Sequence, residues 1–146
     1  MSRVRTTPRR RSREAALQVL YAIDVAGRDG ASASAQEMFE SAEAHFELPE
    51  GARAFAKELI LGVEEQRAAI DARLATNAAH WRVERMAAVD RNVLRLATYE
   101  LCFTTTPAEV VIDEAVELAR RFGADRSPGF VNGILDAVAR AREATQ

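Results

Sequence analysis

Apolar residues recur at helical spacing near the start of the chain. Between residues 8 and 26 they recur in the pattern i, i+3, i+4 and i+7, which is typical of an amphipathic helix. This apolar stripe comprises Ala16, Val19, Leu20 and Ile23. A polar stripe on another face comprises Arg10, Glu14, Gln18 and Tyr21. Thr7 is a suitable N-cap, Pro8 suits the first helical position and Gly27 can end the helix.

The middle of the chain has weaker patterns. Small residues at 28–36 predict a loop. A second helix is expected to follow it through Met38, Phe39, Ala42 and Phe46. A third helix is predicted over 49–65 and a fourth over 67–79, because apolar residues again recur at helical spacing. Their apolar positions are Phe55, Leu59, Ile60 and Val63 in the third, and Ile70 and Leu74 in the fourth.

The C-terminal part of the sequence predicts three clear helices. The first spans 88–104. The second follows a capping box at 106–109, in which Thr106 caps, Pro107 is the first helical residue and Glu109 reaches back. Its stripe is Val111, Ala115, Leu118, Ala119 and Phe122, and Gly123 ends it. Ser127 and Pro128 open the third, which carries Phe130, Val131, Ile134, Leu135 and Val138.

These elements predict an all-α fold, a compact bundle of about seven helices in a single domain of 146 residues. Only 4 Pro and 7 Gly interrupt a chain rich in helix-forming residues, and no strand pattern competes. The segment HWRVERM at 80–86 breaks the helical pattern, and it predicts a boundary between helical halves at about 9–79 and 80–146. Trp81 is expected to pack at that boundary.

The sequence has little that resembles catalytic chemistry. Its two histidines, His45 and His80, and its single cysteine, Cys102, form no metal-binding or nucleophilic pattern, and Cys102 is expected to be a buried, unreactive thiol. No phosphate-binding, zinc-protease or acyl-transfer motif occurs. Asp113 and Glu117 share a helix face, but Glu117 also precedes Arg120 at ion-pair spacing. We therefore expect a non-enzyme without metal or cofactor.

Charge is distributed unevenly along the chain. Residues 1–13 contain six arginines and no acidic residue, whereas the other 133 residues contain 14 basic and 22 acidic residues. Cations at a helix start oppose the helix dipole, each at a cost of roughly 0.3–1 kcal/mol, whereas bound phosphates would reverse that sign. On charge alone, a nucleic-acid-binding end and a solvated arginine tail remain equal alternatives. A single cysteine and the lack of a membrane-spanning stretch indicate an intracellular, cytoplasmic protein.

Four strings resemble the NusB family of bacterial transcription antitermination factors. They are RRRSREAALQVLYAIDV at 9–25, DRNVLRLATYEL at 90–101, PAEVVIDEAVELARRFG at 107–123 and FVNGILD at 130–136. The resemblance implies two packed helical subdomains. It also implies that the chain, with the ribosomal small-subunit protein that acts as NusE, binds the single-stranded boxA element of ribosomal RNA leaders and supports processive transcription by the elongation complex.

Carried over by motif, the RNA contacts would lie on the first helix and in the loop GADRSPGF at 123–130. These candidate contacts are Arg9, Arg10, Arg11, Arg13, Gln18, Tyr21, Arg126 and Ser127. Residues 1–8 would form a flexible basic arm. Tyr21 and Asp90 are candidates for the protein partner, and Arg126 stands where the family often has an acidic or polar residue.

Two other functions remain open on the sequence. The same fold occurs as the N-terminal RNA-binding domain of certain RNA cytosine methyltransferases. The chain could instead be a non-catalytic helical interaction module that forms a homodimer through an apolar face. RNA binding that depends on residues 1–13 would separate this last alternative from the others.

Overall fold

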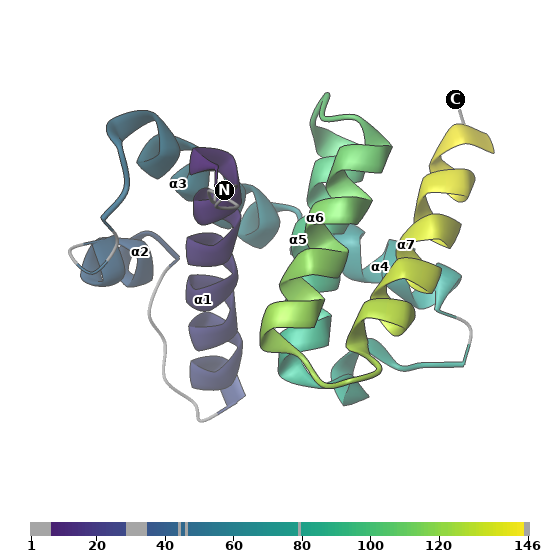
Figure 1. Ribbon diagram of the computed structural model, residues 1–146. Coiled ribbons are helices and arrows are strands. Elements are labelled where there is room, and N and C mark those ends of the chain that lie inside the picture. Colours follow the sequence, from purple (N-terminus) through teal and green to yellow (C-terminus); the bar gives the residue numbers. More distant parts are fainter. Residues whose placement is uncertain (1–6, 29–34, 44, 46, 79, 145–146) are drawn as a thin grey trace. The chain divides into compact units, whose positions relative to one another are not determined.

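The computed structural model describes residues 7–28, 35–43, 45, 47–78 and 80–144, and every regular element in this part is helical (Figure 1). The α-helices are α1 (Pro8–Arg28), α2 (Ala35–Glu43), α3 (Glu50–Glu65), α4 (Arg67–Asn77), α5 (Ala88–Phe103), α6 (Ala108–Phe122) and α7 (Ser127–Ala144). A single 3-10 turn, η1 (Val83–Arg85), precedes α5. The predicted all-α fold of about seven helices is confirmed.

The chain forms two compact units, Met1–Leu61 and Gly62–Gln146, which divide within α3. The sequence placed its boundary later, after residue 79. The difference arises because α4 packs against α5 and α7, so that it belongs with the C-terminal helices although it precedes the interruption at 80–86.

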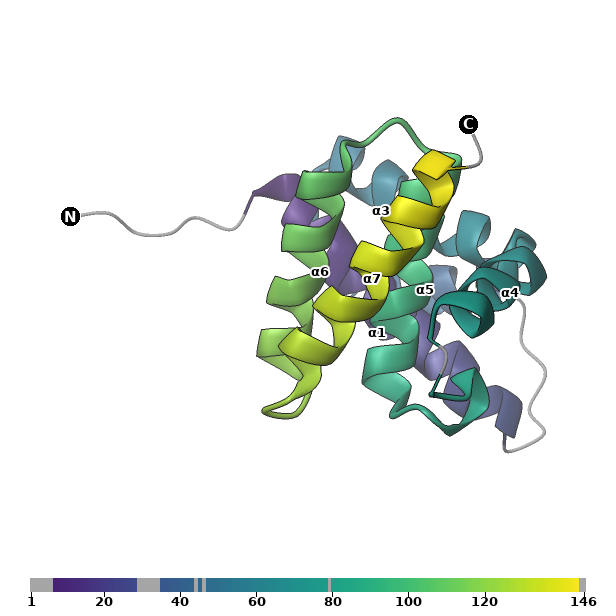
Figure 2. The same cartoon turned by 90° about the vertical axis from the view of Figure 1, so that its right-hand side faces the viewer.

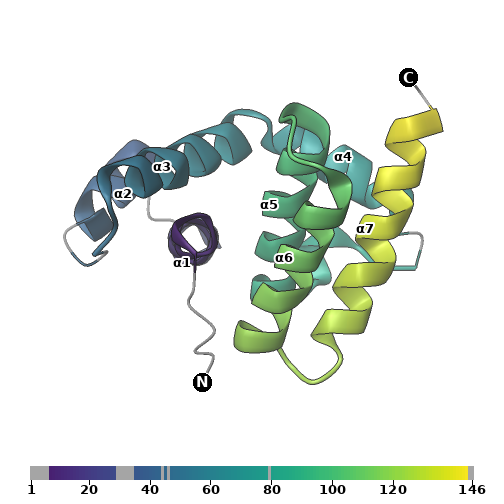
Figure 3. The same ribbon diagram turned by 45° about the horizontal axis from the view of Figure 1, so that its top comes forward.

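In the N-terminal unit, α1 packs against α2 and α3 (Figure 3). The predicted N-cap is confirmed, because the Thr7 hydroxyl accepts a hydrogen bond of 3.1 Å from the Arg10 backbone N–H. The Ser12 hydroxyl lies 2.7 Å from the Ala52 carbonyl and so ties α1 to α3. Gly27 does not end the helix, which continues to Arg28. All four residues of the predicted apolar stripe are buried: Ala16, Val19, Leu20 and Ile23.

In the C-terminal unit, α5 is the central helix, and α4, α6 and α7 pack against it (Figure 2). Gly62, near the end of α3, lies directly against the Tyr99 ring, where even a methyl group would collide with the ring. In α6 the predicted stripe is buried from Val111 to Ala119, but Phe122 is 37% exposed. Burial therefore extends nearly all round α5 and along one face of α6.

Two details at the ends of these helices differ from the prediction. The capping box is wrong: Pro107 rather than Thr106 is the N-cap of α6 and no side chain caps it, because the Thr106 hydroxyl lies 3.3 Å from that of Thr104 instead. Trp81 packs against a neighbouring ring but is not buried. It is 58% exposed and packs edge-to-face on Phe130, with 5.1 Å between ring centroids.

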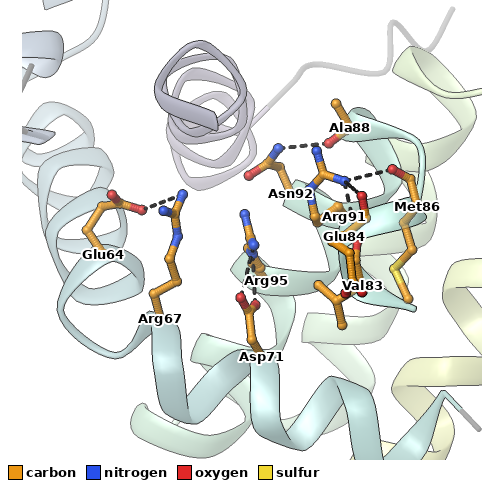
Figure 4. A network of polar contacts seen from close by, with 10 residues as sticks. All are labelled: Glu64, Arg67, Asp71, Val83, Glu84, Met86, Ala88, Arg91, Asn92 and Arg95. Carbon is orange, nitrogen blue, oxygen red and sulfur yellow. Dashed lines mark hydrogen bonds and ion pairs between the residues drawn. The ribbon is translucent and has the colours of Figure 1, made fainter. Parts of the chain in front are cut away.

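A network of polar contacts lies inside the C-terminal unit (Figure 4). The buried Arg91 guanidinium donates to the carbonyls of Val83, at 3.3 Å, and Met86, at 2.8 Å. Arg95 and Asp71 form a two-pronged ion pair at 2.9 and 3.0 Å. Arg91 therefore holds η1 against α5, and Arg95 holds α4 against α5, by charge-assisted hydrogen bonds.

Candidate nucleic-acid interface

The first turns of α1 bring several guanidinium groups together without an acidic residue in the first turn. Arg9 is exposed, and its guanidinium carbon lies 4.3 Å from the centre of the Phe55 ring, a cation–π contact with α3. Arg11 is half-buried and donates to the Glu47 backbone carbonyl. Arg9, Arg10, Arg11 and Arg13 form a basic cluster at the start of α1. The two contacts hold the side chains of Arg9 and Arg11 in place, so that these side chains lose less conformational entropy when a ligand binds.

Arg13 differs from the other members of this cluster. It is only 4% exposed, and its guanidinium carbon lies 5.4 Å from the centre of the Phe55 ring. Arg9 and Arg13 are four residues apart and therefore share the helix face that meets Phe55. The candidate RNA contact at Arg13 is a packing residue in this structure, since its side chain is covered.

The polar stripe of α1 is accessible along its length, as expected. Arg10 and Glu14 are half-buried, whereas Gln18 and Tyr21 are exposed. Tyr21 is 42% exposed although it follows the buried Leu20. This face combines guanidinium groups with an amide and an aromatic ring, the groups that contact phosphates, base edges and base faces in single-stranded RNA.

A groove runs between α1 and α2, beside this polar stripe. Its larger part has a volume of about 350 Å³ and is lined by Gln18, Val19, Ala22, Met38, Ser41, Ala42 and His45. A smaller part of about 180 Å³ lies between α1 and residues that follow α2, and it is lined by Arg11, Glu14, Ala15, Gln18, His45, Glu47 and Leu48. Gln18 and His45 line both parts. The sequence did not indicate this groove, because α2 has only a short apolar pattern.

The remaining candidate contacts belong to the C-terminal unit. Arg126 is exposed, but Ser127 is buried and its hydroxyl accepts a hydrogen bond of 2.9 Å from the Ala124 N–H. Gly123 has no room for a side chain, because a Cβ there would collide with Ser127. Ser127 therefore stabilises the turn between α6 and α7. This candidate RNA contact has a structural role here. Asp90 is half-buried, and its Oδ1 has no hydrogen-bond partner among the described residues.

Two of the groups considered for catalysis, Glu117 and Cys102, have partners or surroundings that the structure describes. Glu117 forms the expected ion pair with Arg120, at 2.5 Å. Cys102 is half-buried rather than buried as expected. Partial burial raises the pKa of its thiol, although Arg73 and Arg142 lower it in part. Within the described ranges, no three His, Cys, Asp or Glu side chains gather as a metal site. Nor does any described helix have the length and apolar character needed to cross a membrane.

Comparison with known proteins identifies the family. Residues 10–140 match the model of the NusB family. The chain belongs to the NusB family. The transcription antitermination protein NusB of Anaeromyxobacter dehalogenans (strain 2CP-1 / ATCC BAA-258) is 47% identical over 137 residues, and the alignment covers 92% of each chain.

Solved NusB structures share the fold as well. NusB from T. maritima is 40% identical, with a TM-score of 0.80 and 93% of each chain covered. A chain of the complex of antitermination factors NusB and NusE with double-stranded RNA is 28% identical, with a TM-score of 0.78, over 92% of this chain and 97% of that one. The resemblance seen in four strings of sequence thus extends over nearly the whole length of NusB.

Proposed function

We propose that this NusB-family chain is a non-catalytic antitermination factor that binds single-stranded, boxA-type RNA together with the ribosomal protein that acts as NusE. The observation that carries the proposal is the accessible stripe of α1, on which Arg10, Gln18 and Tyr21 lie beside the oriented guanidinium groups of Arg9 and Arg11. The solved complex of a NusB relative with NusE and double-stranded RNA supports the part of the proposal that concerns RNA and NusE as partners.

The helix dipole explains why arginines at the start of α1 favour binding of a phosphate. Arginines at the start of α1 oppose the dipole in the free protein, and no acidic residue in the first turn offsets them. A phosphate at this position would be favoured both by the dipole and by the guanidinium groups, which form two-pronged contacts with phosphate oxygens. Tyr21 then offers a ring for stacking, and Gln18 offers an amide for the edge of a base.

A partner protein would complete the RNA site. Outside residues 1–13 the chain is acidic by a net charge of −8, so its own basic footprint is short. A docked ribosomal protein would lengthen that footprint and hold the RNA by two linked contacts. Tyr21 and Asp90 are the proposed contacts for the partner, and membership of the elongation complex is part of the same proposal.

Titration of a labelled boxA RNA tests the proposal at one fixed salt concentration. This chain, the ribosomal protein and their mixture are compared. We expect the mixture to bind at least about tenfold more tightly than this chain alone, equivalent to about 1.4 kcal/mol. RNA should strengthen binding between the two proteins by the same factor, because the coupling is reciprocal.

The controls separate the alternatives. A scrambled RNA of equal length should show less cooperativity, since only the boxA order would suit both proteins. Independent binding of the two proteins would contradict the proposed partnership. RNA affinity unchanged by removal of residues 1–13 and by substitution on α1 would instead favour a protein interaction module.

A further inference from the structure

We infer that the groove between α1 and α2 receives one unstacked nucleobase of the bound RNA, with Gln18 and His45 contacting its edge. This inference rests on the proposed RNA-binding function and adds a base-binding subsite to it. The two parts of the groove join the basic start of α1 to this subsite, because Arg11 lines one part and Gln18 and His45 line both.

The lining of the larger part suits a flat, neutral ring. Its apolar surface comes from Val19 and Ala22 of α1 and from Met38 and Ala42 of α2. A volume of about 350 Å³ lies at the lower end of the range for small-molecule sites. The thioether of Met38 adds a polarisable group of the kind that makes favourable contacts with aromatic rings. The groove therefore offers apolar contact to the face of a base.

Three polar side chains also line the larger part of the groove. Gln18 supplies both a donor and an acceptor, and Ser41 supplies a hydroxyl. His45 follows α2 in a turn that is closed by a hydrogen bond of 2.9 Å from its own N–H to the Ala42 carbonyl. That bond fixes the backbone from which the ring lines the groove. Such groups can read the edge of an unstacked base by hydrogen bonds.

The charges around the groove favour a base over a phosphate as its occupant. Helix α2 contains no cation and three carboxylates, those of Glu37, Glu40 and Glu43. Arg11 is the only arginine or lysine among the residues that line either part, and it lies at the end toward the start of α1. Phosphates would therefore remain near the arginines while a neutral base occupies the groove beside α2. Gln18 is seven residues beyond Arg11, roughly 10 Å along the helix at 1.5 Å per residue.

Two variants of the full-length protein test this subsite with a labelled 12-nucleotide boxA RNA. Ala42→Leu fills the groove with methyl groups and retains a good helix former, and His45→Ala removes one edge contact. We expect Ala42→Leu to weaken binding by roughly 5- to 100-fold, the range for loss of one stacked base. His45→Ala should weaken it by roughly 2- to 10-fold, as for one neutral hydrogen bond. Ala54→Leu, at an exposed position of α3 outside the groove, is the matched control.

Abasic RNAs make the test specific. The base is removed at each RNA position in turn. At one position, its removal should weaken binding to the unmodified protein but should not weaken binding to Ala42→Leu any further. The reason is that the missing base and the substitution remove the same contact. The slope of affinity against salt should stay unchanged in both variants, since no phosphate contact is lost. Additive losses at every RNA position, or wild-type affinity in both variants, would overturn the subsite.

The outcomes also separate the subsite from the function on which it rests. If the unmodified protein binds RNA and Arg10→Ala/Arg11→Ala reduces the salt slope while Ala42→Leu and His45→Ala have no effect, the subsite is wrong and the function stands. If the unmodified protein binds no RNA, alone or with the ribosomal protein, both fail. Circular dichroism checks the folding of Ala42→Leu. If that variant unfolds, His45→Ala with the abasic RNAs decides the question.

Discussion

Helices α1 and α7 begin alike, but the arginines of α1 gather in its first turns, apart from Arg28 at its last residue, whereas those of α7 lie in its last turns. Each has a hydroxyl residue followed by proline at its start, Thr7–Pro8 in α1 and Ser127–Pro128 in α7. In α1 the arginines follow at once. In α7 they come in the last turns, where Arg142 donates to the Leu101 carbonyl at 2.8 Å, near the end of α5.

The helix dipole makes these two arrangements physically different. Cations near a helix C-terminus stabilise it, and Arg142 also satisfies a carbonyl near the end of a second helix. Cations near an N-terminus destabilise the helix unless an anion accompanies them. The position of an arginine along its helix thus decides whether the helix dipole favours its charge or opposes it until an anion binds.

The largest expected effect concerns the arginines of α1. Arg10→Ala/Arg11→Ala should weaken RNA binding by about 3 kcal/mol, from roughly 1.5 kcal/mol for each charged contact. The slope of log affinity against log salt should become less steep by about 1.4, because about 0.7 is lost for each of two phosphate contacts on a single strand. Binding titrations at several salt concentrations measure both quantities.

A matched double variant removes the same charge elsewhere. Arg73→Ala/Arg140→Ala acts at two exposed positions of the C-terminal unit, and it should leave the salt slope nearly unchanged. The free energy of unfolding of the α1 variant should change by less than about 1 kcal/mol, since relief of the dipole offsets the lost contacts. Equal slopes for the two double variants would show that the arginines of α1 make no phosphate contacts beyond those of other exposed arginines.

The next effect concerns the arginines of α7. Arg142→Ala should lower the free energy of unfolding by roughly 1–2 kcal/mol, because it leaves the partly buried Leu101 carbonyl without its charged donor. Arg140→Ala is the control. Its exposed ion pair with Asp136, at 2.9 Å, is worth roughly 0–0.5 kcal/mol. Urea unfolding measures both variants, and equal losses would show that dipole position alone, not the carbonyl contact, matters.

Hydrophobic periodicity predicted most of the fold but not the polar interior of α5. The spacing of apolar residues gave every α-helix to within a few residues, because burial of one face dictates that spacing. It could not reveal that Arg91, Asn92 and Arg95 are also buried, since their burial depends on carbonyls and carboxylates supplied by α4, α5 itself and η1. The capping box failed for a similar reason: Thr104 offered the Thr106 hydroxyl another partner.

The sequence predicted the arginines of α1 as one group of RNA contacts. The structure shows that they lie on different faces of the helix and differ in exposure. Arg10 and Arg13 belong to the same run of arginines in the sequence, yet the Arg13 side chain lies against Phe55 and is buried. That distinction requires knowing where α3 lies. His45 and Ser41 could not be associated with Gln18 from sequence, because only the packing of α2 against α1 brings them to one groove.

The smallest effect concerns the cap at the start of α1. Thr7→Ala removes the acceptor of the Arg10 N–H and should lower the free energy of unfolding by roughly 0.5–1 kcal/mol, the low half of the range for helix caps, because the site is exposed. Hydrogen exchange should become faster at the Arg10 amide but not at the Ile23 amide, since only the first turn frays. Thr7→Ser keeps the acceptor and should exchange as the unmodified protein does. If the Arg10 amide kept its protection in Thr7→Ala, the cap would not be what orders the arginines of α1. The stability of their turn would then have to come from the contacts of Arg9 with Phe55 and of Arg11 with Glu47.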